Sequence, residues 1–127
     1  MSLIQKSVAV LVVLVATACS TTPNQVKSES PKFSIESSKD TKTIAACITD
    51  RMAAKYHRLG NTVTSRMTTG GYVVQYDYVS PMGGSTGMVL EVIEAANGKS
   101  KSTGYFTSGI RGAFVEEAEA ATRDCSK

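Results

Sequence analysis

The hydrophobic pattern of this chain changes its period twice along the sequence, and this limits the possible folds more than any other feature. Across residues 41–59 apolar side chains recur at helical spacing, which predicts an amphipathic helix. Residues 62–107 then alternate with a period of two, which is typical of strands. A second helical pattern begins between Ser108 and Ala113 and runs to about Arg123.

Strong turn signals divide the alternating region into strands. Gly70-Gly71 and Asn97-Gly98 both suit tight hairpins, and the Gly- and Ser-rich stretch Ser80–Thr86 predicts a loop. The expected strands are 62–69, 72–79, 87–95 and about 101–107. We therefore expect an α+β fold, a four-stranded antiparallel meander with the N- and C-terminal helices on one face, in the order α-β-β-β-β-α.

One face of the second expected strand carries three of the five tyrosines in the chain. The residues that share this face are Tyr72, Val74, Tyr76 and Tyr78. We expect this face to pack under the helices, with the hydroxyl groups reaching the rim. The alternative is an exposed aromatic platform for a glycan or a partner chain.

The N-terminus has the pattern of an export signal. Lys6 precedes an unbroken apolar run of nine residues, 8–16. As a helix this run is about 14 Å long, roughly half the ~30 Å hydrocarbon core, so it is too short for a stable transmembrane span. A short basic start, a short apolar core and small residues after it are typical of a secretory signal peptide.

The residues that follow, Val15-Ala16-Thr17-Ala18-Cys19-Ser20, resemble the lipobox of bacterial lipoproteins. The usual Leu three places before the cysteine is Ala16 here. The resemblance implies that Cys19 is acylated and becomes the mature N-terminus, so that the membrane is bound through a lipid anchor. Ser20 is similar to the outer-membrane sorting pattern, which implies a lipid-anchored, periplasm-facing location. The alternative is ordinary signal cleavage at the same small residues.

The number of cysteines favours the lipoprotein interpretation. Export leads to an oxidising compartment, where three cysteines leave one without a partner. Acylation of Cys19 accounts for the odd cysteine, and we expect Cys47 and Cys125 to form a disulfide between the two helices. The alternative is that both of these cysteines are buried and unpaired.

The segment between the predicted anchor and the first helix is rich in Ser, Thr and Pro. Such a composition predicts a flexible tether, although Phe33 and Ile35 could instead dock on the domain. The expected organisation is a signal peptide over 1–18, a lipidated cysteine with a tether over 19–39, and a small α+β domain over 40–127.

Candidate binding residues are few, and each has a structural alternative. Arg51, Lys55 and Arg58 form a basic helix edge that could attract anionic headgroups or an acidic partner, or could be an ordinary solvated edge. In the expected loop 80–86 the candidates are Pro81, Met82 and Ser85.

The loop also contains a match to a catalytic motif. Residues 83–87 match the letters of the G-x-S-x-G nucleophile elbow, but a strand rather than a helix is expected after them. The single histidine, His57, precedes the motif, and none follows it. We therefore interpret residues 83–87 as a connection between strands and His57 as an exposed helix-end residue.

The composition points away from several classes of function. The net charge of +3 is too small for a dedicated nucleic-acid binder. We expect no enzymatic activity, no cofactor and no metal site. The expected function is that of a lipid-anchored outer-membrane domain facing the periplasm that binds another cell-envelope component, and the absence of recognisable catalytic motifs favours a protein as that partner. The alternative is an inhibitor or immunity lipoprotein that blocks a periplasmic or invading hydrolase through the 80–86 loop. The sequence carries no signal for the oligomeric state.

Overall fold

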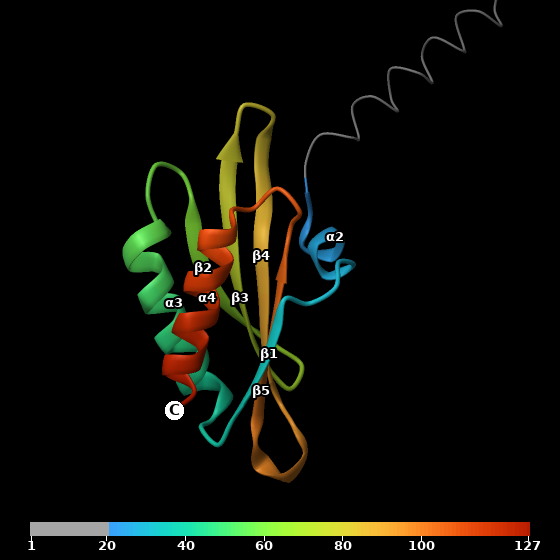
Figure 1. The fold of residues 1–127 in the computed structure, drawn as a ribbon, viewed down its shortest axis with the longest axis vertical. Coiled ribbons are helices and arrows are strands. Elements are labelled where there is room, and N and C mark those ends of the chain that lie inside the picture. Colours follow the sequence, from blue (N-terminus) through green and yellow to red (C-terminus); the bar gives the residue numbers. More distant parts are fainter. Residues whose placement is uncertain (1–20) are drawn as a thin grey trace, which may run out of the picture.

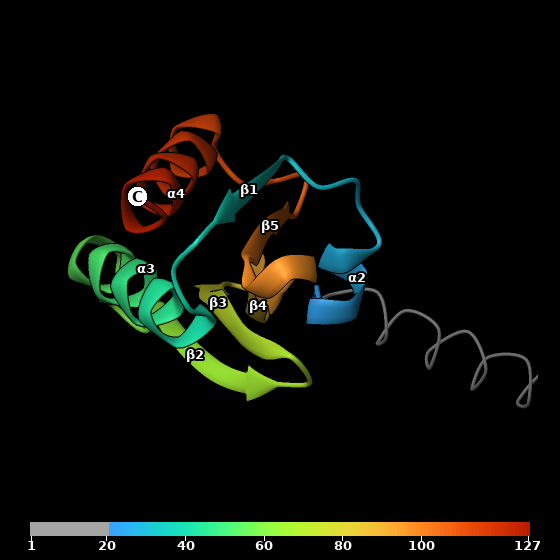
Figure 2. The ribbon, with the colours of Figure 1, turned by 90° about the horizontal axis from the view of Figure 1, so that it is seen from below.

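The computed structural model describes residues 21–127, so the predicted signal peptide and Cys19 lie outside the described residues. The elements, in chain order, are α2 (Pro23–Lys27), β1 (Phe33–Ser37), α3 (Thr41–Tyr56), β2 (Thr62–Thr68), β3 (Gly71–Ser80), β4 (Gly83–Glu94), the 3-10 turn η1 (Ala96–Gly98), β5 (Ser100–Phe106) and α4 (Gly112–Cys125) (Figure 1). The long helices α3 and α4 lie side by side on one face of the sheet, and the short helix α2 lies on the other (Figure 2).

The sheet is antiparallel throughout and has the order β1-β5-β4-β3-β2. The α+β class and the placement of both long helices on one face are confirmed. The prediction of four strands is wrong, because β1 adds a fifth strand at the edge next to β5. The chain therefore meanders from β2 to β5, while β1 joins from a segment that precedes the first long helix.

The fifth strand comes from the segment that was expected to be a flexible tether. Over β1 the side chains of Phe33, Ile35 and Ser37 point into the domain, and the residues between them are exposed. Phe33 lies opposite Gly104 of β5, and a Cβ atom at Gly104 would come within 2.6 Å of the Phe33 ring. The tether prediction is thus corrected over β1, where the alternative of docking through Phe33 and Ile35 holds.

The main core lies between the sheet and the two long helices. Helix α3 begins at the N-cap Asp40, whose side chain accepts a hydrogen bond from the Thr43 amide at 2.7 Å. The helix buries Ile44, Ile48 and Met52 against the sheet. From β3 the same core receives Val74 and Tyr76, with Tyr72 and Tyr78 partly buried beside them. The prediction that the tyrosine face packs under the helices is therefore confirmed.

Helix α2 covers part of the second face of the sheet. Its one buried side chain, Val26, packs against Val73 and Val89. The helix is fixed by a capping box between Thr22 and Gln25, and Lys27 forms an ion pair with Glu91 of β4 at 2.6 Å. Most side chains of α2 are polar, so the helix has only one apolar side chain to bury. The Val26 contact, the capping box and the Lys27–Glu91 ion pair hold it on the sheet.

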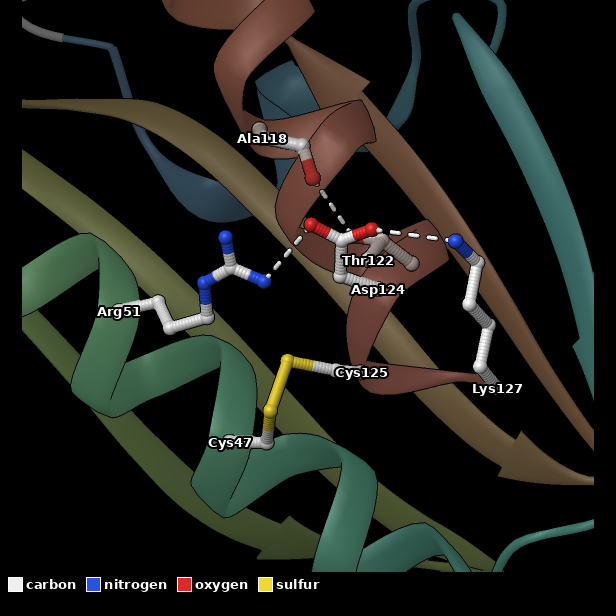
Figure 3. A network of polar contacts seen from close by, with 7 residues as sticks. All are labelled: Cys47, Arg51, Ala118, Thr122, Asp124, Cys125 and Lys127. Atoms are coloured by element: carbon white, nitrogen blue, oxygen red, sulfur yellow. Dashed lines mark hydrogen bonds and ion pairs between the residues drawn. A yellow bond between two sulfur atoms is a disulfide. The ribbon is translucent and has the colours of Figure 1, made fainter.

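A disulfide between Cys47, in the N-terminal half of α3, and Cys125, the last residue of α4, joins the two long helices, as expected (Figure 3). The Cα atoms are 5.8 Å apart, and the two cysteines are separated by 78 positions in the sequence. Beside the disulfide, the Arg51 guanidinium on α3 pairs with the Asp124 carboxylate on α4 at 3.0 Å. The disulfide and the ion pair together hold the C-terminal end of α4 against α3.

Candidate functional site

A hollow of about 500 Å³ lies where α3 ends, α4 begins and β3 approaches its hairpin. Its lining is mainly aromatic and aliphatic and consists of Tyr56, Asn61, Tyr76, Tyr78, Val79, Gly109, Ile110, Arg111, Ala113 and Phe114. We call this feature the aromatic hollow. Its size falls within the usual range for ligand and peptide sites, about 300–1,000 Å³.

The aromatic walls of the hollow pack against one another. The ring centroids of Tyr56 and Phe114 lie 4.6 Å apart in an edge-on arrangement, and those of Tyr76 and Phe114 lie 4.7 Å apart. Tyr76 and Tyr78 stack at 6.1 Å on the same face of β3. These are favourable separations for aromatic pairs, so the walls of the hollow are already ordered before any partner binds.

A β-bulge packs behind two of the residues that line the hollow, Tyr76 and Ile110. The pairing of β3 with β4 shifts between Tyr76 and Asp77, which leaves Gly87 as the extra residue on β4. A Cβ atom at Gly87 would come within 2.9 Å of Ile110 and 3.0 Å of the Tyr76 ring. The Gly87 carbonyl also accepts a hydrogen bond from the Thr107 amide at 3.0 Å, which fixes the start of the loop before α4. Because Gly87 has no side chain, Ile110 and the Tyr76 ring can both pack closely against the backbone at this position.

A polar cluster holds Tyr56 at the inner edge of the hollow. The Tyr56 hydroxyl donates to one carboxylate oxygen of Glu117 at 2.5 Å, and the Lys55 ammonium donates to the other at 2.5 Å. Burial, together with the neighbouring carboxylate, raises the pKa of Tyr56 to about 12. The hydrogen bonds from Lys55 and Tyr56 lower the pKa of Glu117. Tyr56 is thus a neutral donor near neutral pH and serves as a rigid wall.

Three loops meet at the end of the molecule that contains the hollow, and they lie at the top of Figure 1. We call this the hairpin end and define it by residues 57–61, 81–82 and 107–111 together with Val79. It exposes large apolar side chains, since Leu59 is 93% exposed, Met82 64% and Val79 60%. The Asn61 side-chain oxygen accepts a hydrogen bond from the Val79 amide at 3.0 Å, which ties the first loop to β3.

The residues of the predicted basic edge lie on α3 and at its end, and each has a partner within the domain. Arg51 pairs with Asp124, and Lys55 pairs with Glu117. The Arg58 side chain donates two hydrogen bonds to the Lys55 carbonyl, at 2.8 and 3.0 Å. Two of the three charges are therefore balanced by carboxylates of α4, while Arg58 lies at the hairpin end.

The predicted loop over residues 80–86 is mostly strand, which is a correction to the sequence interpretation. Strand β3 continues to Ser80 and β4 begins at Gly83, so only Pro81 and Met82 form the turn. Pro81 and Met82 are exposed at the tip, whereas Ser85 is 8% exposed within β4. The Gly residues that suggested a loop instead serve the hairpin and the bulge.

Ser85 does not have the setting of a nucleophile elbow, because it lies inside an antiparallel strand. His57 is at the C-cap of α3, as expected for an exposed helix-end residue, and its Nδ1 atom accepts a hydrogen bond from the Val63 amide at 3.3 Å. Among residues 21–127 no group of three or more His, Cys, Asp or Glu side chains is placed to hold a metal ion.

The chain matches no protein-family model, no curated protein and no solved structure. None of the helices in the described part of the chain is long and apolar enough to cross a membrane. The assignment of a function therefore rests on the geometry of the site and on the sequence patterns.

The sequence patterns predicted the elements that carry the hollow but not how these elements assemble. Tyr56 and Phe114 lie in the two predicted helices, and Tyr76 and Tyr78 lie on the predicted tyrosine face. Ile110 and Arg111 were not singled out, since they lie in a connection whose course depends on the bulge at Gly87. An unpaired glycine between two strong strand patterns was the available signal for that bulge.

Proposed function

We propose that this protein is a lipid-anchored, outer-membrane domain that faces the periplasm and binds another envelope protein without carrying out catalysis. The aromatic hollow is the observation that carries the binding proposal. It combines packed aromatic walls, a close approach of Ile110 to Tyr76 that Gly87 permits, and an exposed arginine, Arg111, at its rim. Aromatic residues and arginine are the residue types most enriched at energetically important positions of protein interfaces.

The cysteines support the anchoring part of the proposal. The disulfide uses Cys47 and Cys125, which leaves Cys19 as the third cysteine of the chain. Cys19 is also the residue that the lipobox resemblance assigns to acylation. Disulfides persist in oxidising compartments, which agrees with export to the periplasm.

The chemistry of the hollow favours a particular kind of partner segment. Its walls offer flat aromatic surfaces, which suit an inserted apolar, aromatic or proline side chain. Arg111 is exposed and can pair with a carboxylate next to the inserted side chain. The proposed ligand is therefore a short, extended segment of an envelope protein that carries an apolar anchor beside an acidic group.

The alternative function, inhibition of a hydrolase through the 80–86 loop, has less support. It needs a projecting loop, whereas β3 and β4 pair up to a turn of two residues. Only Pro81 and Met82 extend beyond the sheet at this point. Ser85, which that mechanism would place in a target's active site, is buried.

Site-specific photo-crosslinking in the native cells tests the proposal. A photoreactive residue at Ile110 lies in the hollow, and one at Asn97 in the β4–β5 turn is the matched control at the opposite end. We expect one discrete protein adduct from position 110 and none from position 97. The adduct should decrease at least tenfold when Gly87→Val displaces Ile110 and Tyr76, which line the hollow, with the fold of that variant checked by circular dichroism.

The same cells settle the anchoring part by mass spectrometry of the mature N-terminal peptide. Diacylglyceryl and acyl groups on Cys19 are expected. Equal crosslinking from positions 110 and 97 would refute binding through the hollow. An uncleaved leader or an unmodified Cys19 would refute the lipid anchor.

A further inference from the structure

The N-terminal segment attaches to the domain on the outer half of β4, close to the hairpin end. The Thr86 amide donates a hydrogen bond to the Thr21 carbonyl at 3.0 Å, and α2 follows directly with its capping box at Thr22. Figure 1 shows this attachment point near the top of the molecule, beside the β3–β4 hairpin. The first described residue is thus held against the sheet instead of leading into a long flexible linker.

Chain length then limits where a lipid on Cys19 can lie. Cys19 precedes Thr21 by two positions, and two residues span at most about 7 Å. Along β4, Thr86 lies four residues from Met82, which is about 13 Å. It lies eight residues from Glu94 at the other end of β4, which is about 26 Å. An anchor at Cys19 therefore lies nearer to the hairpin end than to the opposite end of the domain.

The surface at the hairpin end has the composition of a membrane-contacting surface. The exposed side chains of Leu59, Val79 and Met82 extend from it. Its loops contain Arg58 and Arg111 and no Asp or Glu. Exposed apolar residues next to basic ones are typical of protein surfaces that lie in the headgroup region of a bilayer, where arginine is attracted to anionic lipids.

We infer that the hairpin end rests on the bilayer, with Leu59, Val79 and Met82 in the headgroup region. Three observations lead to this inference: the position at which the N-terminal segment attaches, the short distance from there to Cys19, and the composition of the exposed surface. This inference deepens the proposed function and rests on its lipid anchor. The long axis of the domain then stands away from the membrane, and the β4–β5 turn is the most distant part. The aromatic hollow lies at the hairpin end, so its partner meets it near the level of the headgroups.

Depth measurements on the complete, acylated protein in vesicles test this orientation. In the acylated protein Cys19 carries lipid, and Cys47 and Cys125 are joined in the disulfide. A single introduced cysteine can therefore be labelled specifically with a fluorophore. Probes go to Met82→Cys at the tip, Asn97→Cys at the opposite end and Ser30→Cys after α2, which reports a side-on orientation. The vesicles contain phosphatidylethanolamine and phosphatidylglycerol, with bromine on some of the acyl chains.

We expect brominated lipid to quench the probe at position 82 strongly and those at 30 and 97 weakly. Iodide in the buffer should show the reverse order, with at least fivefold less quenching at position 82 than at 97. The variant Leu59→Asp, with the probe at 82, should lose part of this protection while the protein stays bound. Equal iodide quenching at 82 and 97, or greater lipid quenching at 30 than at 82, would overturn the inference.

The failure of this inference can be distinguished from the failure of the proposed function. Mass spectrometry of the same vesicle-bound sample reports acylation of Cys19, and crosslinking from Ile110 reports binding through the hollow. An acylated protein with an exposed probe at position 82 refutes the orientation alone. An unmodified Cys19 refutes the shared anchor and with it the orientation.

Discussion

Reduction of the Cys47–Cys125 disulfide is expected to remove a large fraction of the stability of the domain without removing any atom. The two cysteines are 78 positions apart, so the crosslink closes a long loop in the unfolded chain. The entropy of closing a loop of this length corresponds to about 4.5 kcal/mol at 25 °C. A domain of this size has a total free energy of unfolding of about 5–15 kcal/mol, so the loss is a large fraction of it.

The expected loss arises in the unfolded state, since the folded helices keep their other contacts. Thr122 stays bonded to the Ala118 carbonyl within α4, and the Arg51–Asp124 ion pair still joins the helices (Figure 3). At roughly 4–5 °C per kcal/mol for a domain of about 100 residues, the midpoint should fall by about 20 °C. The urea m-value should rise, because an unfolded chain without a crosslink exposes more surface.

Circular dichroism during thermal and urea unfolding, with and without reductant, measures both quantities. The double variant Cys47→Ala/Cys125→Ala is the control, because reductant should leave its unfolding curve unchanged. If reduction of the native protein changes the free energy of unfolding by less than about 1 kcal/mol and leaves m unchanged, the loop-entropy reasoning is refuted.

Three further predictions concern single residues, and chemical denaturation or thermal scans check them. Val26→Ala should lower the free energy of unfolding by about 2 kcal/mol, because Val26 is fully buried under the sheet; an unchanged midpoint would mean that α2 does not stay docked. Gly104→Ala should cost about 1–3 kcal/mol through its clash with Phe33, whereas Gly109→Ala, with open space around it, should be nearly neutral. Folding lowers the pKa of Glu117 below its ordinary value of 4.5, so the ionised carboxylate stabilises the fold above that pH, and this stabilisation is lost as the pH falls through the lowered value. Glu117→Gln should therefore make the midpoint of thermal unfolding less sensitive to acid. An acid profile identical to that of the native protein would contradict this.

Much of the fold could be predicted from local patterns. The helix over Thr41–Tyr56 has a capping Asp40, and the Asn97-Gly98 pair adopts positive φ values of 68° and 71° at the β4–β5 turn, as its sequence indicates. The disulfide followed from the odd number of cysteines and from their positions on two helices. For the helix and the turn, a short segment of sequence contained the physical reason; for the disulfide, the number of cysteines did.

The elements that the sequence did not predict depend on distant contacts. Strand β1 has only two apolar residues, Phe33 and Ile35, and it becomes a strand by pairing with β5 about 70 residues later. Helix α2 depends on one buried side chain, Val26. The loop prediction over residues 80–86 failed because Gly83, Gly84 and Gly87 weaken a strand pattern that pairing with β3 restores. These elements form because of contacts with residues distant in the sequence, and local residue preferences carry no information about such contacts.

The position of β1 at the edge of the sheet has a consequence for the order of folding. A chain that emerges with its N-terminus first presents β1 long before its neighbour β5 has been synthesised. Until then Phe33 and Ile35 remain without their partners, and the disulfide must wait for Cys125 at the end of α4. The domain can therefore complete its structure only after α4 has been synthesised, so that a chaperone that protects the early hydrophobic segments has a defined period in which to act.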